Sequence, residues 1–535
     1  MSRILKLVAA AICQAVAATA TAAVGGEVSL EDRITRVKAV SDGVCSVTSA
    51  SLVAKDGVPV KDPLAEWAAM QSDDVRAQGA FLRVDFSLVP EAGSDVRCRA
   101  ELPMPDKWDG RLWGQGNSGY AGALPRITSY VAEGTAAVTT DLGTRSITDC
   151  GKSNSKIWPA NVRRDFNWRA THLMTVYGKR IVAAFYGRPC NKAYFFGGST
   201  GGRQAMSEAL RFPDDYDGII AGLPDNNAAV SEIAAWHLWR QTHDSNGHAL
   251  FTTNDMRVVA DAAIEYRAGR DPAPYSGNFL ADARFSEADI DGFLALAARR
   301  VPSLASGDRL QRLKALYVPL VHEGVCYFNG YAPGSYLGRN MSWMGIINLR
   351  SYLMESGMTA IVARWKDVGW KEIAGYLREY APEFNACSPN LSAFAKCGGK
   401  LVMVAGWEDQ TIPPAPIVDY YERVCRKDGG LERTREYFRL FCAPGCAHGG
   451  GAGRAMTGVP GGATLRKQLV DWRENGVPPK SIPATGPGRT RMPVAAYPGL
   501  FVKEASGKWV ERMVRRGVAQ IDERCLATEC EVGKR

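Results

Sequence analysis

Residues 197–201 (GGSTG) have the pattern GxSxG, which constrains the fold of this chain more than any other stretch. They follow residues 192–196 (KAYFF), which are typical of a short strand, and precede residues 200–210, which are typical of a helix. On a tight strand-to-helix turn, small residues at both ends of the pattern let the backbone close and expose the central serine. The context favours a nucleophile at Ser199 over the alternative, a glycine-rich turn with a solvated serine.

Predicted strands and helices alternate on both sides of this turn. We expect strands at residues 80–86, 98–102, 134–141, 217–222 and 400–406, and helices at residues 164–186 and 465–475. Repeated strand–helix–strand units predict an α/β protein with a mostly parallel sheet flanked by helices. With the serine turn at a strand end, this arrangement is the α/β-hydrolase fold.

The middle of the chain has a different composition from its two ends. Residues 225–385 are rich in predicted helix and carry five tryptophans, at positions 236, 239, 343, 365 and 370. We interpret this segment as a large helix-rich lid domain inserted into the sheet. Residues 23–224 and 386–535 then form the catalytic domain of the 535-residue chain.

The first 22 residues have the pattern of an export signal. Arg3 and Lys6 precede an apolar run from residue 7 to residue 20, and Ala20-Thr21-Ala22 fits a cleavage site with small residues. The alternative is a transmembrane helix, but the run is short for one. We predict a signal peptide and a secreted or periplasmic protein without a membrane partner.

Cysteine content and charge limit the partners of the chain. Twelve of its 13 cysteines lie beyond the leader, and an even number in an exported protein predicts disulfides. Candidate pairs are Cys45 with Cys98, Cys442 or Cys446, and Cys525 with Cys530. No cysteine or histidine spacing fits zinc. The net charge is +9, but the basic residues are scattered, so we expect no nucleic-acid partner.

A serine nucleophile of this kind needs a histidine base and an acid that follow it in the order Ser, Asp or Glu, His. Of the six histidines, only His448 lies after the late strand at residues 400–406. Asp409 comes just past the end of that strand, where catalytic groups of such sheets gather. Glu408 and Asp419 are the competing candidates for the acid. We predict the triad Ser199, Asp409 and His448.

The oxyanion of an acyl-transfer intermediate needs two backbone amides. The motif supplies the amide of Thr200, and a second should come from a loop after an earlier strand. Residues 111–122 (RLWGQGNSGYAG) contain such a loop, and within its turn at residues 116–119 we select Ser118 and Gly119 as candidate donors. An ordinary turn is the alternative. This chemistry needs no metal and no organic cofactor.

Long runs of the chain resemble the tannase and feruloyl esterase family. They include WDGRLWGQGNSGYAG, YFFGGSTGGRQAMSEALRFPDDYDGIIAGLP, GWEDQTIPP, HGGGAG and LVDWRENGVPP, and they extend from about residue 100 to residue 480. The resemblance implies an α/β-hydrolase domain with a lid, and small aromatic or phenolic esters, such as feruloyl or galloyl esters, as substrates. It carries the nucleophile to Ser199, the acid to Asp409 and the base to His448.

The chain departs from the family in two places. The family joins a cysteine before the serine to one after the histidine, and here these positions are Gly198 and Gly449. The family also has an aspartate-rich calcium loop in its lid, whereas residues 260–274 (ADAAIEYRAGRDPAP) lack repeated aspartates and glycines, so we expect no calcium. Phe328, Trp343 and Arg350 are candidates for contacting the substrate, with core packing or a solvated charge as the alternative.

Two other functions compete with an esterase. The chain could be a catalytically silent binding protein that kept the fold, or a peptidase on the same scaffold. The presence of Ser199, Asp409, His448 and both glycine-rich turns argues against the first.

Overall fold

The computed structural model describes residues 28–53, 79–144, 158–268, 270, 279–341, 367–448, 463–485, 491–504, 506–514 and 517–528. The predicted signal peptide lies outside these residues, as do Trp343, Arg350, Gly449 and Cys530. No helix among the described residues is both long and apolar enough to span a bilayer.

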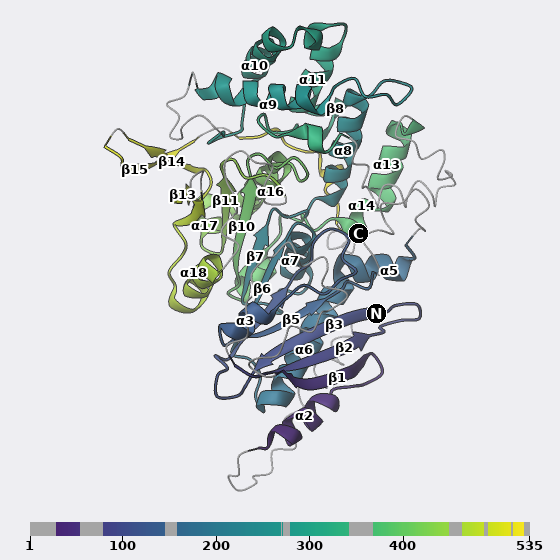
Figure 1. The fold of residues 1–535 in the computed structure, drawn as a ribbon, viewed down its shortest axis with the longest axis vertical. Coiled ribbons are helices and arrows are strands. Elements are labelled where there is room, and N and C mark those ends of the chain that lie inside the picture. The colour runs from purple at the N-terminus through teal and green to yellow at the C-terminus, as the bar shows by residue number, and fades with distance from the viewer. Residues whose placement is uncertain are drawn as a thin grey trace.

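A nine-stranded sheet runs through the described part of the chain in the order β1-β2-β3-β5-β4-β6-β7-β10-β11 (Figure 1). Its strands are β1 (Cys45–Val53), β2 (Phe81–Leu88), β3 (Val96–Pro103), β4 (Arg111–Gln115), β5 (Ala136–Thr140), β6 (Lys192–Gly198), β7 (Gly218–Gly222), β10 (Lys400–Gly406) and β11 (Phe438–Ala443). β1, β2 and β3 pair antiparallel, and β3 pairs antiparallel with β5. The strands from β5 to β11 are parallel, which confirms the predicted α/β-hydrolase architecture.

Helices cover both faces of this sheet, which explains why its central strands are almost continuously apolar. On one face lie α2 (Leu30–Lys38), α6 (Ala170–Tyr186), α7 (Thr200–Arg211) and α16 (Pro414–Asp428), and on the other lie α3 (Thr128–Ala132), α18 (Ala463–Asn475) and the hairpin of β12 (Ser481–Thr485) and β13 (Arg491–Ala495). Neighbouring residues of a strand enter opposite cores: in β6, Tyr194 packs with α18 and Phe195 with the α7 side. Each strand therefore contributes to two cores at once.

The segment between β7 and β10 leaves the sheet and returns to it, and it includes residues 225–385, the predicted lid. It contains α8 (Ala228–Thr242), α9 (Thr253–Ala268), α10 (Glu287–Arg300), α11 (Arg309–Tyr317), β8 (Leu320–His322), β9 (Val325–Phe328), α13 (Trp370–Glu379), α14 (Ala381–Phe384) and α15 (Ser392–Lys396). Helices α9, α10 and α11 gather at the top of Figure 1, away from the antiparallel end of the sheet. Because β7 and β10 are hydrogen-bonded neighbours, the segment between them has the topology of an insertion.

The remaining elements are short or near the C-terminus. Among them are α5 (Ala160–Arg164), α17 (Leu431–Arg435), β14 (Gly499–Lys503) and β15 (Trp509–Met513). The helix expected over residues 164–186 is interrupted by a π-helical turn, Asp165–Arg169, in which Arg169 Nε bonds Asp165 Oδ1 at 2.6 Å. The apolar spacing that predicted this helix starts at Ala170, after the turn, so it contained no information on the turn.

The cysteine prediction needs a correction. Cys45, Cys98 and Cys442 are buried free thiols, so the pair expected between Cys45 and Cys98 is not formed in the structure. Burial raises the pKa of the Cys45 thiol to about 11, and it also raises the pKa of Cys98. Two cysteines form a disulfide only if their distance and orientation allow it, and an even number of cysteines does not predict either.

Candidate active site

Ser199 occupies the turn between β6 and α7 with a backbone that few residues adopt. Its φ is 59° and its ψ is −120°, and its amide donates to Gly222 O at 2.9 Å. A positive φ at a non-glycine residue stores strain and is typical of functional sites. Gly197 and Gly201 leave no room for a side chain, because backbone atoms lie close to them. A Cβ at Gly197 would lie 2.2 Å from Gly201 O, and one at Gly201 would lie 2.7 Å from Asn117 O. Sequence and backbone agree on a nucleophile turn.

The structure brings the three predicted triad residues together. His448 Nε2 lies 3.0 Å from Ser199 Oγ, and His448 Nδ1 lies 2.8 Å from Asp409 Oδ2. Ser199 lies at the carboxyl end of β6, Asp409 follows β10 and His448 follows β11, so three parallel strands deliver them to one edge of the sheet. Both imidazole nitrogens are engaged, one by the acid and one by the serine hydroxyl.

The acid position is well defined by local bonding. Asp409 is fully buried, and its Oδ1 accepts the amides of Thr411 at 2.9 Å and Ile412 at 2.8 Å. These bonds leave Oδ2 for His448. The two competing acids face other partners: Glu408 Oε1 accepts the amide of Leu280, and Asp419 pairs with Arg423.

The charge around His448 favours its protonated form. Burial lowers the pKa of the imidazole, but the charge and hydrogen bond of Asp409 raise it by more, so that the pKa lies above its ordinary value of 6.5. Asp225 adds to the rise and Arg339 opposes it. Asp225 follows β7, and its amide donates to Ser199 O at 3.2 Å. We did not predict Asp225 from the sequence, because nothing local relates it to a histidine more than 200 positions later.

Two main-chain amides of the second glycine-rich turn, residues 116–119, donate hydrogen bonds to described residues of the protein, and two do not. Gly116 donates to Phe196 O and Asn117 donates to Gln204 Oε1, each at 2.8 Å. Within the described part of the chain, the amides of Ser118, Gly119 and Thr200 have no protein acceptor. These are the three positions selected from the sequence as oxyanion donors.

One group of side chains among the described residues could hold a metal, and it lies at the opposite end of α7 from Ser199. It comprises His172, Glu208 and Asp215, whose ligand atoms lie within 4.8 Å of one another. His172 Nδ1 already bonds Asp215 Oδ2 at 2.7 Å, and Lys179 Nζ lies 3.5 Å from Asp215 Oδ1. Burial and the neighbouring Asp215 raise the pKa of Glu208 well above its ordinary value. A lysine at the cluster and a direct His–Asp bond are typical of a structural network.

Two further predictions concerned calcium and substrate contacts. Of residues 260–274, where we expected no calcium, 260–268 belong to α9 and 271–274 lie outside the described residues. Phe328 is fully buried and packs edge-on against Tyr331 at 5.0 Å, which is core packing.

The geometry defines what the site can do chemically. An imidazole within hydrogen-bond distance of a serine hydroxyl can take its proton, and a buried carboxylate on the other nitrogen orients the ring and stabilises its positive form. Unused amides beside the serine can bind a developing oxyanion. This is the equipment for acyl transfer through a covalent intermediate.

Comparisons with known proteins find similarity to ester hydrolases. A family model described as tannase and feruloyl esterase matches residues 83–272 and 355–508. A probable feruloyl esterase of Arthroderma benhamiae is 28% identical over 72% of this chain and 74% of its own length. The mono(2-hydroxyethyl) terephthalate hydrolase of Piscinibacter sakaiensis is 27% identical over 78% of this chain and 80% of its own.

The fold also has a solved relative. The crystal structure of feruloyl esterase B from Aspergillus oryzae superposes with a TM-score of 0.75 at 21% identity, covering 90% of this chain and all of that one. At this identity the likeness concerns the fold.

Proposed function

The chain belongs to the tannase and feruloyl esterase family and is a carboxylic ester hydrolase; we propose that it works through the triad Ser199, His448 and Asp409 on esters of aromatic acids. The observation that carries the triad is the continuous pair of hydrogen bonds, 3.0 Å from Ser199 Oγ to His448 Nε2 and 2.8 Å from His448 Nδ1 to Asp409 Oδ2.

The first half of the proposed reaction forms an acyl-enzyme. His448 Nε2 takes the proton of Ser199, and Oγ attacks the ester carbonyl while Asp409 stabilises the imidazolium. The amides of Thr200 and of Ser118 or Gly119 bind the oxyanion. The tetrahedral intermediate then collapses, and His448 returns the proton to the departing alcohol.

The second half regenerates the enzyme. Water enters where the alcohol left, His448 takes a proton from it, and the hydroxide attacks the acyl carbon. Collapse of the second intermediate returns the proton to Ser199 Oγ and releases the carboxylic acid. These steps use no metal and no cofactor, so EDTA should leave the rate unchanged, and a rate that fell and returned with calcium would contradict this.

The names of two relatives support aromatic esters as the substrate class. Two of them carry the names of a feruloyl esterase and of a hydrolase for a terephthalate monoester, both esters of aromatic acids. We also propose export to the periplasm or medium, which is supported by the leader at residues 1–22.

A panel of esters tests this function. Methyl ferulate, methyl gallate and mono(2-hydroxyethyl) terephthalate would be compared with p-nitrophenyl acetate and with a peptide p-nitroanilide, using wild type and Ser199→Ala. We expect hydrolysis of an aromatic ester by wild type and its loss in the variant. Equal inactivity of both proteins would contradict the esterase, and faster cleavage of the anilide would indicate a peptidase.

A further inference from the structure

The segment 116–123 has a strained backbone conformation at one residue, Ala121. It carries the Ser118 and Gly119 amides, so any catalytic role of this segment rests on the proposed function. Within it, φ is 53° at Gly119, 54° at Ala121 and 83° at Gly122. The value at Ala121 costs about 1–3 kcal/mol, because a Cβ disfavours this region. Contacts from outside must therefore keep the segment in place.

One end of the segment is attached to the helix of the nucleophile. Gly201 donates its amide to Asn117 O at 2.9 Å, and Thr200 donates its hydroxyl to Gly119 O at 2.5 Å. Asn117 in turn donates its amide to Gln204 on α7. These bonds bring the segment next to Thr200, but they involve only its first four residues.

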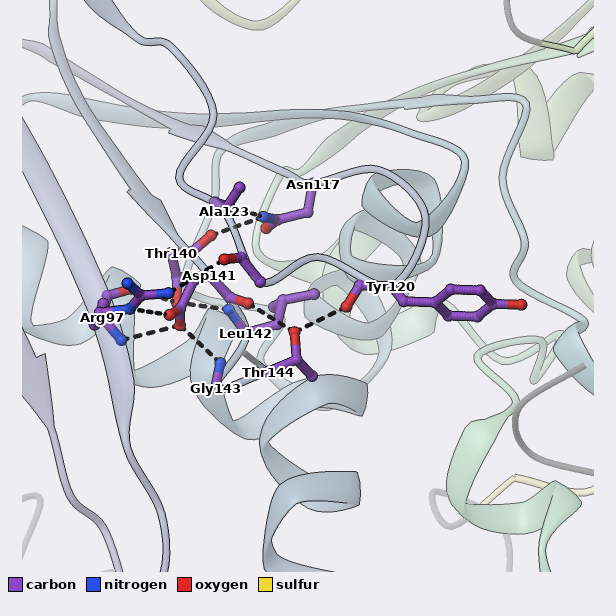
Figure 2. A network of polar contacts seen from close by, with 10 residues as sticks. Arg97, Asn117, Tyr120, Ala123, Thr140, Asp141, Leu142, Gly143 and Thr144 are labelled. Atoms are coloured by element: carbon purple, nitrogen blue, oxygen red, sulfur yellow. Dashed lines mark hydrogen bonds and ion pairs between the residues drawn. The ribbon is translucent and has the colours of Figure 1, made fainter. Parts of the chain in front are cut away.

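The other end is held by an ion pair that belongs to neither glycine-rich turn (Figure 2). Arg97 on β3 uses Nε to bond Asp141 Oδ2 at 2.6 Å and Nη2 to bond Gly122 O at 3.1 Å. Asp141 follows β5, and its main-chain carbonyl accepts the amide of Gly122 at 3.0 Å. One guanidinium and one aspartate thus hold both main-chain polar groups of Gly122.

Two neutral residues complete this support. Asn117 donates its side-chain amide to Thr140 O at 2.8 Å and to Ala123 O at 3.1 Å. Thr144 donates its hydroxyl to Tyr120 O at 2.8 Å, while the ring of Tyr120 points away from the network in Figure 2. The bonds to Thr140 and Thr144 attach the segment to the end of β5 and to the residues that come after it.

The Asp141 carboxylate is itself rigidly placed. It is fully buried and accepts the amides of Arg97 at 3.0 Å and Gly143 at 2.8 Å in addition to the guanidinium. Burial raises the pKa of this carboxyl, and Arg97 and the Gly143 amide oppose the rise. A buried carboxylate with this many fixed donors moves little, so it serves as a reference point for the guanidinium.

We propose that Arg97 and Asp141 are positioning residues for ester hydrolysis, which fix the far end of segment 116–123 so that the amides of Ser118 and Gly119 stay in place for the oxyanion. In this role neither side chain contacts the substrate, and each acts through the main chain of the segment. Their effect is on the transition state, in which the oxyanion exists, and it should therefore reduce kcat and leave KM nearly unchanged.

The test compares Asp141→Asn with a matched control, Glu101→Gln. Glu101 is a buried carboxylate on β3, paired with Arg83 at 2.9 Å and bonded to Thr128, outside the segment. We expect Asp141→Asn to lower kcat by about 10-fold to 100-fold, since a misplacement of about 1 Å has that effect, and Glu101→Gln to stay within about twofold of wild type. Equal losses in both variants would overturn the proposal.

Two further variants keep the test informative if Asp141→Asn does not fold. Arg97→Lys retains the charge but cannot bond Asp141 and Gly122 in one plane, and Thr144→Val removes one hydroxyl at nearly constant volume. We expect each to lower kcat more than KM changes, with Arg97→Lys showing the larger loss. A change confined to KM would contradict a role at the oxyanion.

A measurement that does not depend on activity separates this inference from the proposed function. Hydrogen exchange of the peptide covering residues 116–123 should quicken in Asp141→Asn and not in Glu101→Gln. Unchanged exchange would overturn the positioning role even in an active esterase. The opposite result is also distinguishable. If exchange quickened in Asp141→Asn while wild type and Ser199→Ala were equally inactive, the proposed function would be contradicted and the structural role of Arg97 and Asp141 would stand.

Discussion

Gln410 bonds both main-chain polar groups of His448. Its Oε1 accepts the amide of His448 at 3.2 Å, and its Nε2 donates to His448 O at 3.5 Å. Gln410 is buried, and Asn340 donates to its carbonyl at 2.9 Å. The family resemblance implies a disulfide beside the triad, at two positions that are Gly198 and Gly449 in this chain. Side-chain clamping of the histidine backbone supplies a restraint of the same kind, although a weaker one.

Gln410→Ala should therefore lower kcat by about 10-fold to 100-fold with a small change in KM, because a loosened His448 spends less time within bonding distance of Ser199. Initial rates on the best ester of the panel measure this. Gln468→Ala is the matched control, since Gln468 also donates to a main-chain carbonyl, Ser481 O at 3.0 Å, on the distant helix α18. Equal rates for Gln410→Ala and wild type would show that the clamp is dispensable.

The pH dependence of kcat/KM should follow His448. Its imidazole must be neutral to accept the serine proton, and its pKa is raised above 6.5, so the rate should fall as the pH drops through a midpoint above 6.5. Asp409→Asn removes the charge that raises this pKa, so the midpoint should move to lower pH and the plateau should fall by about 10⁴-fold. A profile with an unshifted midpoint would argue against the pairing.

Stability should respond to pH in the opposite direction. A histidine whose pKa is raised by folding stabilises the folded state fully below its unfolded pKa of about 6.5, and this contribution is lost as the pH rises through the folded pKa. The Tm difference between wild type and Asp409→Asn should therefore be largest in mild acid and shrink towards alkaline pH. A difference that grew with pH would show that the interaction acts on the neutral imidazole.

Gly197 and Gly198 should differ sharply in tolerance. A Cβ at Gly197 would lie 2.2 Å from a backbone oxygen, whereas the nearest atom to a Cβ at Gly198 is 3.7 Å away. Gly197→Ala should lower Tm markedly or prevent folding, because the turn must open by more than an ångström, at a cost of about 1–3 kcal/mol or more. Gly198→Ala should fold with a Tm near wild type. Thermal melts of both variants decide this, and similar Tm values would contradict the close approach at Gly197.

Losses from Ser199→Ala and His448→Ala should not add. Each should reduce kcat by roughly 10⁴-fold to 10⁶-fold, and the double variant should be little worse than either, because the residues act as one unit. The measurement is kcat at saturating ester for the two single variants and the double variant. Multiplicative losses would mean that the two residues act in separate steps.

Local patterns in the sequence determined a large part of this protein. The strand, turn and helix around Ser199 depend on near-neighbour chemistry. So does the strand that precedes Asp409, which begins and ends at the predicted residues 400 and 406. Order along the chain, together with the family resemblance, was enough to select His448 among six histidines.

The tertiary structure alone decided which distant groups face one another. It placed Asp225 near His448, clamped His448 with Gln410 and joined Gly122 to the Arg97–Asp141 pair. It also left the thiols of Cys45 and Cys98 unjoined, against expectation. These contacts depend on how strands far apart in the sequence lie side by side in the sheet, as β7 and β10 do. Periodicity indicates which face of a helix or strand is buried. It contains no information on which other helix or strand packs against that face.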